Sequence, residues 1–546
     1  MLTKLTKNLP LLLILLLALF LRSYKINSFP PLNPDEAAIA YNAYSLIETG
    51  HDEHGDTLPI HFKSFGDFKP GGYFYLALPF VKLLGTTVTA VRLPNLILSI
   101  LTIFVLYQLV ILISDNKKLA LLSALIITTS PWHIHFSRGA WESSATLSFL
   151  TFGTYFFFKS VLSTKFSPKF FTYFLILFVA SLYTYHSARI FAPLLALSLF
   201  ITYSKILIKN YRQLLIPIFF AILISVPVLV SFLTSGGTTR FGGVGLTADQ
   251  GPIWRANELI NQDASTALFY RIIHNKRLLY LISWAQKYFS HFDLNYLFLT
   301  GDEVPRSKSP EMGQFYLFQL PLFFLGLLSF YKTKLLNPKA KKIIFLWFLF
   351  APLASSLTFQ APSALRSLPL VIPLSFFIAI GLYITLDYIF KFKYLLLRYL
   401  SYTFLIVIFI YSFLFYLDSY FIHSPKRYPT AWNYGFSQLS EYLKQNPTTD
   451  PVYITYKYDQ PYIMILFFTK YPPQIIQKEI ELTSPDQYGF STVTHFGNYH
   501  FQKIIWPDIP PNSLIISSDE PVPISPTDTI YFPNHQPAFK IYYKHE

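Results

Sequence analysis

Two adjacent acids, Asp35 and Glu36, follow the first apolar run of this chain. They stand in Asn33-Pro34-Asp35-Glu36, where Asn33 or Asp35 would cap a helix and Pro34 suits its first turn. Acidic side chains are also favoured there by the helix dipole. Capping accounts well for one acid, but less well for two beside a membrane. A carboxylate that accepts a proton from a substrate is therefore the functional alternative.

A second stretch, 133–142, contains His133, His135, Arg138 and Glu142 between two apolar runs. Arg138 and Glu142 are four residues apart, so on one helix they would form a simple ion pair. Ionisable groups at the edge of a bilayer are costly, however, and are usually functional. His-x-His suggests metal, but the signal is weak without a defined third ligand. We assign no metal site.

Two further arginines occupy similar positions. His186 precedes Arg189 in the stretch 183–189, and Arg366 lies in 360–369. A lone arginine at the end of an apolar run usually anchors the span by snorkelling. Together with Arg138 they are three arginines on the side of the membrane where positive charge is disfavoured. This favours an anionic ligand such as a lipid phosphate, which arginine binds through two hydrogen bonds.

The composition indicates that these residues lie in a membrane protein. Of the 546 residues, 52% are hydrophobic and 13% are charged, whereas soluble domains carry about 25% charged residues. The net charge of +15 would suggest nucleic acid in a soluble protein. Here the basic residues cluster in short loops between apolar runs, as membrane topology requires, so we expect no nucleic-acid partner. The absence of Cys excludes thiol catalysis and Cys-ligated metal.

Eleven apolar runs are long enough for us to predict membrane spans, since a span needs roughly 20 residues. They are 9–24, 92–113, 118–131, 143–162, 168–185, 189–205, 212–234, 314–331, 342–358, 366–388 and 397–418. A shorter run, 73–84, is typical of an interfacial or buried helix instead.

The basic residues decide the orientation. If 73–84 does not span, one side of the membrane receives every lysine-rich loop, from Lys4 and Lys7 through 332–342 to Arg398. The opposite short loops then receive one arginine each. If 73–84 did span, every loop from Lys117 onward would change sides. Since Lys and Arg favour the cytoplasm, we predict a cytoplasmic N-terminus and an extracytoplasmic C-terminus.

The predicted fold is an all-α polytopic membrane protein of about eleven spans. It has a large first outer loop and a small C-terminal α/β domain outside the cytoplasm, indicated by alternating stretches such as 452–456. The expected segments are the first span at 1–24, the first outer loop with juxtamembrane helices at 25–91, spans two to seven at 92–234, a second outer loop at 235–313, spans eight to eleven at 314–418, and the extracytoplasmic domain at 419–546.

Acids and cations gathered at one lipid interface suit sugar transfer from a lipid phosphate. That reaction needs a carboxylate base for the acceptor hydroxyl and positive groups for the phosphate leaving group. A single displacement inverts the anomeric centre. The alternative is a transporter or flippase of a lipid-linked glycan, which should carry charge along the middle of its spans. A non-catalytic assembly factor is a third hypothesis. The middles of the spans are almost free of charge, which favours the transferase.

At these residues the chain resembles the GT-C membrane glycosyltransferases of family 39 type, which include protein O-mannosyltransferases and lipid A aminoarabinose transferases. The resemblance covers roughly the first 230 residues well and the spans after 314 loosely. It is carried by Asp35-Glu36, Lys69-Pro70-Gly71-Gly72-Tyr73, Arg92-Leu93-Pro94, Ser137-Arg138 with Glu142, and Ala364-Leu365-Arg366 with Pro369.

The resemblance implies a role for each site residue. Asp35 resembles the catalytic base and Glu36 its assistant, while Glu142 stands where these enzymes often have an aspartate. Contacts to the lipid phosphate are expected from Lys69, Arg138, Arg189 and Arg366, with His133, His135 and His186 as further candidates.

The resemblance also indicates the partners and the location. The donor would be a polyprenyl-phosphate-linked sugar, and the acceptor a protein or a glycan. The chain has no mannosyltransferase-type MIR repeats, so we expect a prokaryotic cell-envelope enzyme in the plasma (inner) membrane. The sequence leaves the sugar, the acceptor and the use of a divalent metal open.

The topology can be tested directly. A reporter enzyme fused after Leu84 should report a non-cytoplasmic position, because the run before it does not cross the membrane. Reporter activity after fusion measures this, and a fusion after Lys118 serves as the cytoplasmic control. A cytoplasmic signal after Leu84 would contradict the eleven-span topology.

Overall fold

The computed structural model describes residues 2–231, 245–263, 268–484 and 491–545. Two compact units divide the chain. The helical unit comprises Met1–Leu21, Leu98–Phe136 and Ser143–Tyr416. The loop unit comprises Arg22–Ile97, Ser137–Glu142 and Leu417–Glu546. The first outer loop and the C-terminal domain thus lie in one unit.

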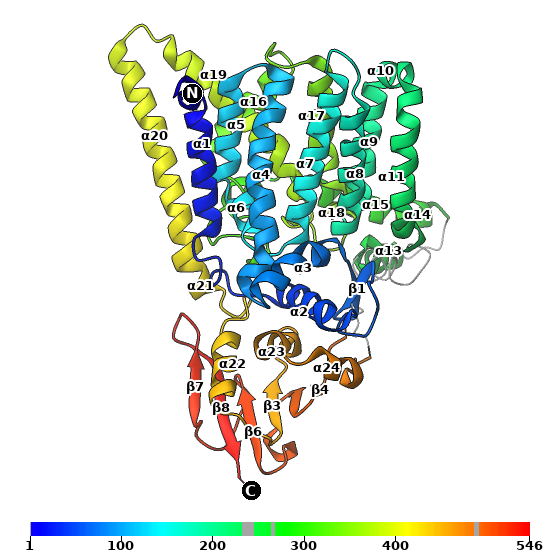
Figure 1. Ribbon diagram of the computed structural model, residues 1–546, viewed down its shortest axis with the longest axis vertical. Coiled ribbons are helices and arrows are strands. Elements are labelled where there is room, and N and C mark those ends of the chain that lie inside the picture. Colours follow the sequence, from blue (N-terminus) through cyan, green and yellow to red (C-terminus); the bar gives the residue numbers. More distant parts are fainter. Residues whose placement is uncertain (1, 232–244, 264–267, 485–490, 546) are drawn as a thin grey trace. The chain divides into compact units, whose positions relative to one another are not determined.

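Helices form most of the helical unit, and the longer ones run along one another (Figure 1). The helices that lie wholly or mostly in this unit are α1 (Leu2–Ser23), α4 (Val88–Ser114), α5 (Lys117–Thr129), α6 (Pro131–Ser137), α7 (Glu142–Val161), α8 (Pro168–Thr184), α9 (Ala188–Thr202), α10 (Ser204–Lys209), α11 (Tyr211–Ser231), α16 (Gln319–Phe330), α17 (Pro338–Phe350), α18 (Leu353–Ser356), α19 (Val371–Phe390) and α20 (Leu395–Asp418). Each of the eleven predicted spans coincides with a helix. The run 342–358 is divided between α17 and α18.

Glycines bring two of these helices unusually close together. A Cβ atom on Gly326 of α16 would lie 1.8 Å from the carbonyl oxygen of Phe377, and one on Gly381 of α19 would lie 1.9 Å from that of Leu322. No side chain fits at either position. Small residues at helix contacts are typical of membrane bundles, where close backbone packing drives association.

The chain is a multi-pass membrane protein by the length and composition of its helices. Among the described residues, four helices are long and apolar enough to cross a bilayer alone, and a fifth crossing is possible if a bent helix pair is one span. The four are Val88–Ser114, Tyr211–Ser231, Leu368–Phe390 and Leu395–Arg427, and the bent pair is Lys117–Thr129 with Pro131–Ser137. Further apolar helices are shorter, so the count of eleven stays a prediction.

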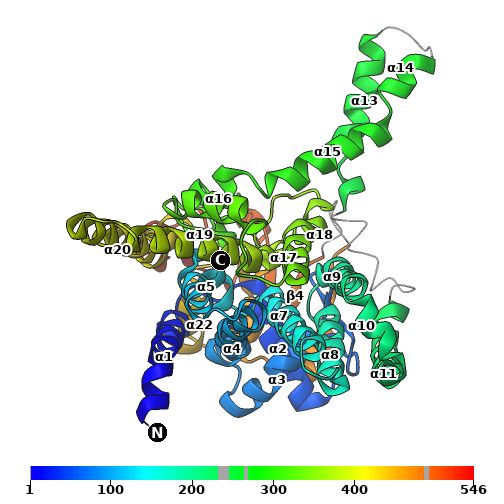
Figure 2. The same cartoon turned by 90° about the horizontal axis from the view of Figure 1, so that it is seen from above.

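Part of the expected outer loop 235–313 lies outside the described residues, namely 235–244 and 264–267. Its described helices, seen reaching away from the bundle in Figure 2, are α13 (Gly251–Gln262), α14 (Leu268–Ile273) and α15 (Lys276–Ser290). The short helices η1 (Leu246–Ala248), η2 (Asn295–Leu299) and η3 (Pro305–Ser307) flank them.

The N-terminal part of the loop unit consists of helix α2 (Pro34–Thr49), a hairpin of β1 (His61–Ser64) and β2 (Asp67–Pro70), and helix α3 (Gly72–Leu84). The hairpin pairs Phe62 with Lys69 across its two strands. The 13 residues of α3 extend about 20 Å at 1.5 Å per residue. A bilayer core is roughly 30 Å thick, so α3 is too short to span it upright.

A six-stranded sheet in the order β4-β5-β3-β6-β8-β7 forms the small C-terminal domain. Strand β3 runs parallel to β5 and β6, and the other neighbours pair antiparallel. The strands are β3 (Val452–Thr455), β4 (His495–Phe496), β5 (Tyr499–Gln502), β6 (Ser513–Ser517), β7 (Asp528–Tyr531) and β8 (Pro537–Lys544), with helices α21 (Ser424–Arg427), α22 (Phe436–Gln445), α23 (Pro461–Thr469) and α24 (Pro473–Glu479). The predicted α/β domain is confirmed.

This domain is fastened to helix α2 of the first loop. The hydroxyl group of Tyr41 donates to the carbonyl oxygen of Tyr471 at 2.7 Å. The amide Nε2 of Gln477 lies 3.0 Å from the Ser45 Oγ and 2.9 Å from the Thr49 Oγ1. Buried polar groups need such partners. The C-terminal domain therefore stabilises the helix that begins at the two acids.

Candidate active site

Helix α2 begins at a capping box. The side chain of Asn33 accepts a hydrogen bond from the backbone N–H of Glu36 at 3.0 Å, and the Glu36 Oε2 accepts one from the backbone N–H of Asn33 at 3.2 Å. Pro34 occupies the first turn. This reciprocal arrangement satisfies two backbone donors that a helix start leaves open. Of the two capping residues expected, Asn33 is the one that caps.

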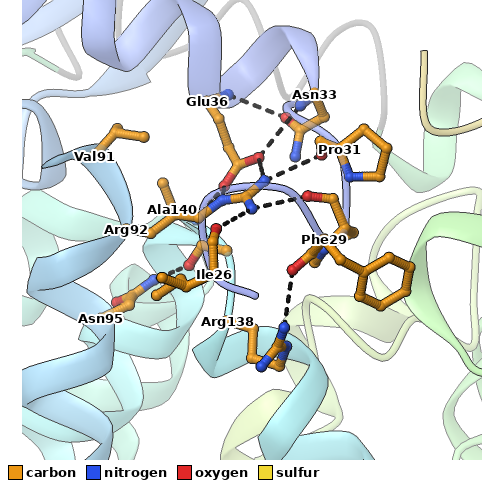
Figure 3. A network of polar contacts seen from close by, with 12 residues as sticks. Ile26, Phe29, Pro31, Asn33, Glu36, Val91, Arg92, Asn95, Arg138 and Ala140 are labelled. Carbon is orange, nitrogen blue, oxygen red and sulfur yellow. Dashed lines mark hydrogen bonds and ion pairs between the residues drawn. The ribbon is translucent and has the colours of Figure 1, made fainter. Parts of the chain in front are cut away.

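A buried ion pair joins Glu36 to Arg92 of helix α4 (Figure 3). The Arg92 Nε donates to the Glu36 Oε1 at 2.7 Å, and the Arg92 Nη2 donates to the Glu36 Oε2 at 2.6 Å. The side chains are 0% and 1% exposed. Such two-point pairs are strong and fix geometry, so Glu36 holds the start of α2 to α4. Its predicted part in catalysis, as an assistant of the base, stays a prediction.

The remaining donors of Arg92 hold the segment before α2. Its Nη1 donates to the carbonyl oxygens of Ile26 and Pro30, both at 2.8 Å, and its Nη2 to that of Pro31 at 3.1 Å. A buried charge is costly unless further hydrogen bonds satisfy it. Here one guanidinium group organises both the loop that leads to the acids and the first turn of α2.

Residues 138–141 close the network from another side (Figure 3). The backbone N–H of Ala140 donates to the Glu36 Oε1 at 2.8 Å. Asn95 of α4 donates to the carbonyl oxygens of Gly139 and Trp141 at 2.7 and 2.9 Å. A Cβ atom on Gly139 would lie 2.6 Å from the Trp141 Nε1. Glycine is therefore required for this close approach.

Arg138 is fully buried beside that network. Its Nη2 donates to the carbonyl oxygens of Tyr24 and Phe29 at 2.6 and 2.9 Å, and its guanidinium lies 5.0 Å from the ring centre of Phe421. Helix α6 ends at Ser137 and α7 begins at Glu142. Arg138 and Glu142 therefore do not share one helix, which the simple ion-pair interpretation required. Contact of Arg138 with a lipid phosphate stays a prediction.

Asp35 differs from its neighbour because it remains accessible. Its side chain is 38% exposed and forms an ion pair with Lys69, whose side chain is 9% exposed. Lys69 projects from β2, and its Nζ lies 4.6 Å from the ring centre of Phe65. The Coulomb attraction is stronger where a cation is partly removed from water. The structure therefore brings together Asp35 and Lys69, two of the predicted site residues.

The loop after α2 contains a second group of ionisable residues that the sequence reasoning missed. Burial raises the pKa of Asp52, and it raises the pKa of Glu53 to about 8. Burial also lowers the pKa of His54 to about 4. Three consecutive ionisable residues in an outer loop were the available signal. Nothing in the sequence indicated that they are buried.

The other predicted residues belong to the helical unit. His133 and His135 are buried in α6, and the His135 Nε2 lies 2.7 Å from the carbonyl oxygen of Arg306. His186 and Arg189 are half-buried at the start of α9. Their roles stay predictions. Among the described residues, no three His, Asp or Glu side chains gather closely enough to hold a metal ion.

Arg366 lies in a loop with a rigid polar support. Its Nη1 donates to the Thr358 Oγ1 at 3.2 Å and to the carbonyl oxygen of Gln360 at 3.0 Å. The buried Asp302 accepts from the backbone N–H of Ala364 at 2.6 Å. Burial raises the pKa of Asp302, and the hydrogen bond from Ala364 and the charge of Arg366 act in the opposite direction. The loop thus holds its arginine in a defined place.

Comparisons with known proteins confirm the resemblance seen in the sequence. The family model of dolichyl-phosphate-mannose-protein mannosyltransferases matches residues 12–235. The fold is similar to that of ArnT from Cupriavidus metallidurans, solved bound to undecaprenyl phosphate, with 10% identity, 85% coverage of each chain and a TM-score of 0.52. None of the curated protein sequences matches the chain.

A second solved structure supports the same fold. The oligosaccharyltransferase AglB from Archaeoglobus fulgidus, in complex with an inhibitory peptide and a dolichol phosphate, has a TM-score of 0.50 and 12% identity over 85% of this chain. The match spans 64% of AglB, a little under two thirds of that longer protein. Identities this low establish the fold, which is that of GT-C membrane glycosyltransferases.

Replacing Glu36 tests its structural function. Glu36→Gln should lower the stability of the protein, because the buried guanidinium of Arg92 loses its charged partner, and breaking such a pair costs roughly 3–5 kcal/mol. Thermal unfolding in detergent measures the loss. The matched control is Glu48→Gln, at an exposed position of the same helix. Equal unfolding temperatures for the two variants would contradict the assignment.

Proposed function

We propose that this chain, which has the fold of GT-C membrane glycosyltransferases, transfers a sugar from a polyprenyl-phosphate donor to an acceptor hydroxyl. The transfer takes place on the extracytoplasmic face and inverts the anomeric centre. The proposal rests on one observation, which is that the two adjacent acids differ in exposure and in ion-pair partner. Glu36 is enclosed in its ion pair with Arg92, whereas Asp35 is 38% exposed and paired with Lys69.

In this proposal Asp35 is the base. Its carboxylate takes the proton of the acceptor hydroxyl as the acceptor oxygen forms a bond to the anomeric carbon of the sugar. The bond between that carbon and the phosphate oxygen breaks, and polyprenyl phosphate leaves with the electron pair. A positioned carboxylate of this kind accelerates a reaction typically by 10²–10⁴-fold. Its exposure allows an acceptor hydroxyl to reach it.

Lys69 interacts with both the base and the phosphate leaving group in this proposal. Its ammonium group pairs with the Asp35 carboxylate and offers a charge-assisted hydrogen bond to the phosphate of the donor. When the phosphate takes a share of this cation, the Asp35 carboxylate loses part of its stabilisation and becomes a better base. Charge that develops on the leaving phosphate is stabilised by the same ammonium group.

The remaining predicted residues are assigned to binding of the donor or the other substrate. We assign Arg366 and Arg189 to the phosphate as further cations. Arg138 is assigned the same role in addition to holding Tyr24 and Phe29 in place. Glu142, at the first position of α7, is assigned to the substrate side of the site. The solved relative ArnT binds undecaprenyl phosphate, which agrees with a polyprenyl-phosphate donor here.

Removing the base tests the proposal. Asp35→Asn keeps the size of the side chain but cannot accept the proton, so turnover should fall by roughly 10²–10⁴-fold. Turnover is measured by mass spectrometry of the glycosylated product, with purified protein and a panel of polyprenyl-phosphate sugars. Donor binding should survive. The matched control is Asp56→Asn, at an exposed position of the same outer loop. Unchanged turnover in Asp35→Asn would exclude Asp35 as the base.

Removing the cation tests the donor site. Lys69→Met preserves most of the volume of a nearly buried side chain while removing its charge. A hydrogen bond to a charged group contributes about 1.5–3 kcal/mol, so donor binding should weaken roughly 10- to 100-fold. Titration of the protein in lipid nanodiscs with polyprenyl phosphate measures the change. Lys82→Met in α3 is the control, and equal affinities for the two variants would exclude Lys69 from the donor site.

A further inference from the structure

Glu53 is a buried carboxylic acid that the proposed chemistry leaves without a function. Its side chain is 0% exposed, and neither carboxyl oxygen receives a hydrogen bond from the described residues. Asn42 is its polar neighbour: the Glu53 N–H donates to the Asn42 Oδ1 at 2.9 Å, and the Asn42 side chain lowers the pKa of the carboxyl group. The charged form of such a group is expensive to bury. A carboxyl group kept in this position therefore needs an explanation.

The surroundings of Glu53 keep it protonated at neutral pH. Burial raises its pKa to about 8; the charge of Asp52 acts in the same direction, while the Asn42 side chain and the charge of Lys69 act against it. His54 lies 3.6 Å away through its Nε2. The pKa of His54 is lowered to about 4 by burial and by the charge of Lys63, so it is neutral and provides no counter-charge.

Four structural elements present titratable groups to Glu53. Its own loop contributes Asp52 and His54, and strand β2 contributes Lys69. Helix α2 contributes Tyr41, and helix α23 of the C-terminal domain contributes Tyr462. Lys69 is the basic side chain of this group, and it interacts with two carboxyl groups. It forms an ion pair with Asp35, and its charge lowers the pKa of Glu53.

We propose that Glu53 is a positioning residue that keeps Lys69 available for the phosphate of the donor. As a neutral acid it leaves the ammonium group paired with Asp35 at the accessible side. As a carboxylate it attracts the ammonium group toward the interior and competes with the phosphate for it. This inference rests on the proposed function, because it assumes that Lys69 receives a lipid phosphate.

A pH profile of lipid binding tests the inference. The probe is polyprenyl methyl phosphate, a phosphodiester without a sugar, titrated against the full-length protein in nanodiscs between pH 6 and 9.5. Because the charge of a phosphodiester is constant over this range, changes in affinity report on the protein. The wild type should lose affinity by up to about fivefold between pH 8 and pH 9, since the protonated fraction of an acid falls from one half at its pKa to about one tenth one pH unit higher.

Two variants separate a positioning role from a structural one. Glu53→Gln is a neutral isostere, so it should bind the probe like the wild type at pH 6.5 and keep that affinity at pH 9. Glu48→Gln, at an exposed position of α2, should follow the wild-type profile. Folding of each variant is checked by thermal unfolding.

The outcomes distinguish the two proposals. If Glu53→Gln loses affinity with pH as the wild type does, or binds poorly at pH 6.5 while folded, the positioning role of Glu53 is overturned and the donor assignment stands. If the folded wild type does not bind the probe at any pH, the lipid-phosphate donor is overturned as well. A flat profile for Glu53→Gln beside a falling wild-type profile supports the inference.

Discussion

The ion pair between Arg92 and Glu36 is the interaction on which the first loop depends. One guanidinium group satisfies a carboxylate and three backbone carbonyls, while the same carboxylate caps α2 and receives the N–H of Ala140. A lysine has no planar fork and could not make these contacts together. Because the pair is fully removed from water, loss of either partner leaves a charge uncompensated. The position of Asp35, one residue before Glu36, follows from this network.

Three carboxyl groups in the loop unit differ in function because their surroundings differ. Glu36 is buried and paired with Arg92, so it holds the start of α2 in place. Asp35 is 38% exposed and paired with Lys69, a cation that can also bind a phosphate. Glu53 is fully buried, which raises its pKa to about 8. Burial raises the pKa of an acid and a neighbouring cation lowers it. Here Lys69 forms an ion pair with Asp35, and its charge also acts on Glu53.

Much of the fold could be predicted because it depends on local patterns. Apolar runs coincide with helices, the run 73–84 forms a short helix, and alternating stretches near 452 form strands of the C-terminal domain. The cap at Asn33 was predictable for the same reason. The ion-pair partner of Glu36 was not predictable, since Arg92 is 56 residues away and nothing in the sequence indicates that the two side chains meet. The burial of Glu53 was also not predictable, because no local pattern indicates it and one of its neighbours, Tyr462, lies about 400 positions later in the chain.

The same long-range contacts give the C-terminal domain a supporting part in the first loop. Tyr471 and Gln477 are hydrogen-bonded to α2, the helix that begins at the two acids. Tyr462 of α23 lies close enough to Glu53 for the charge of that acid to raise the pKa of the tyrosine. Residues more than 400 positions apart in the chain therefore share one polar environment, and the helix that carries Asp35 depends on a domain at the other end of the sequence for part of its support.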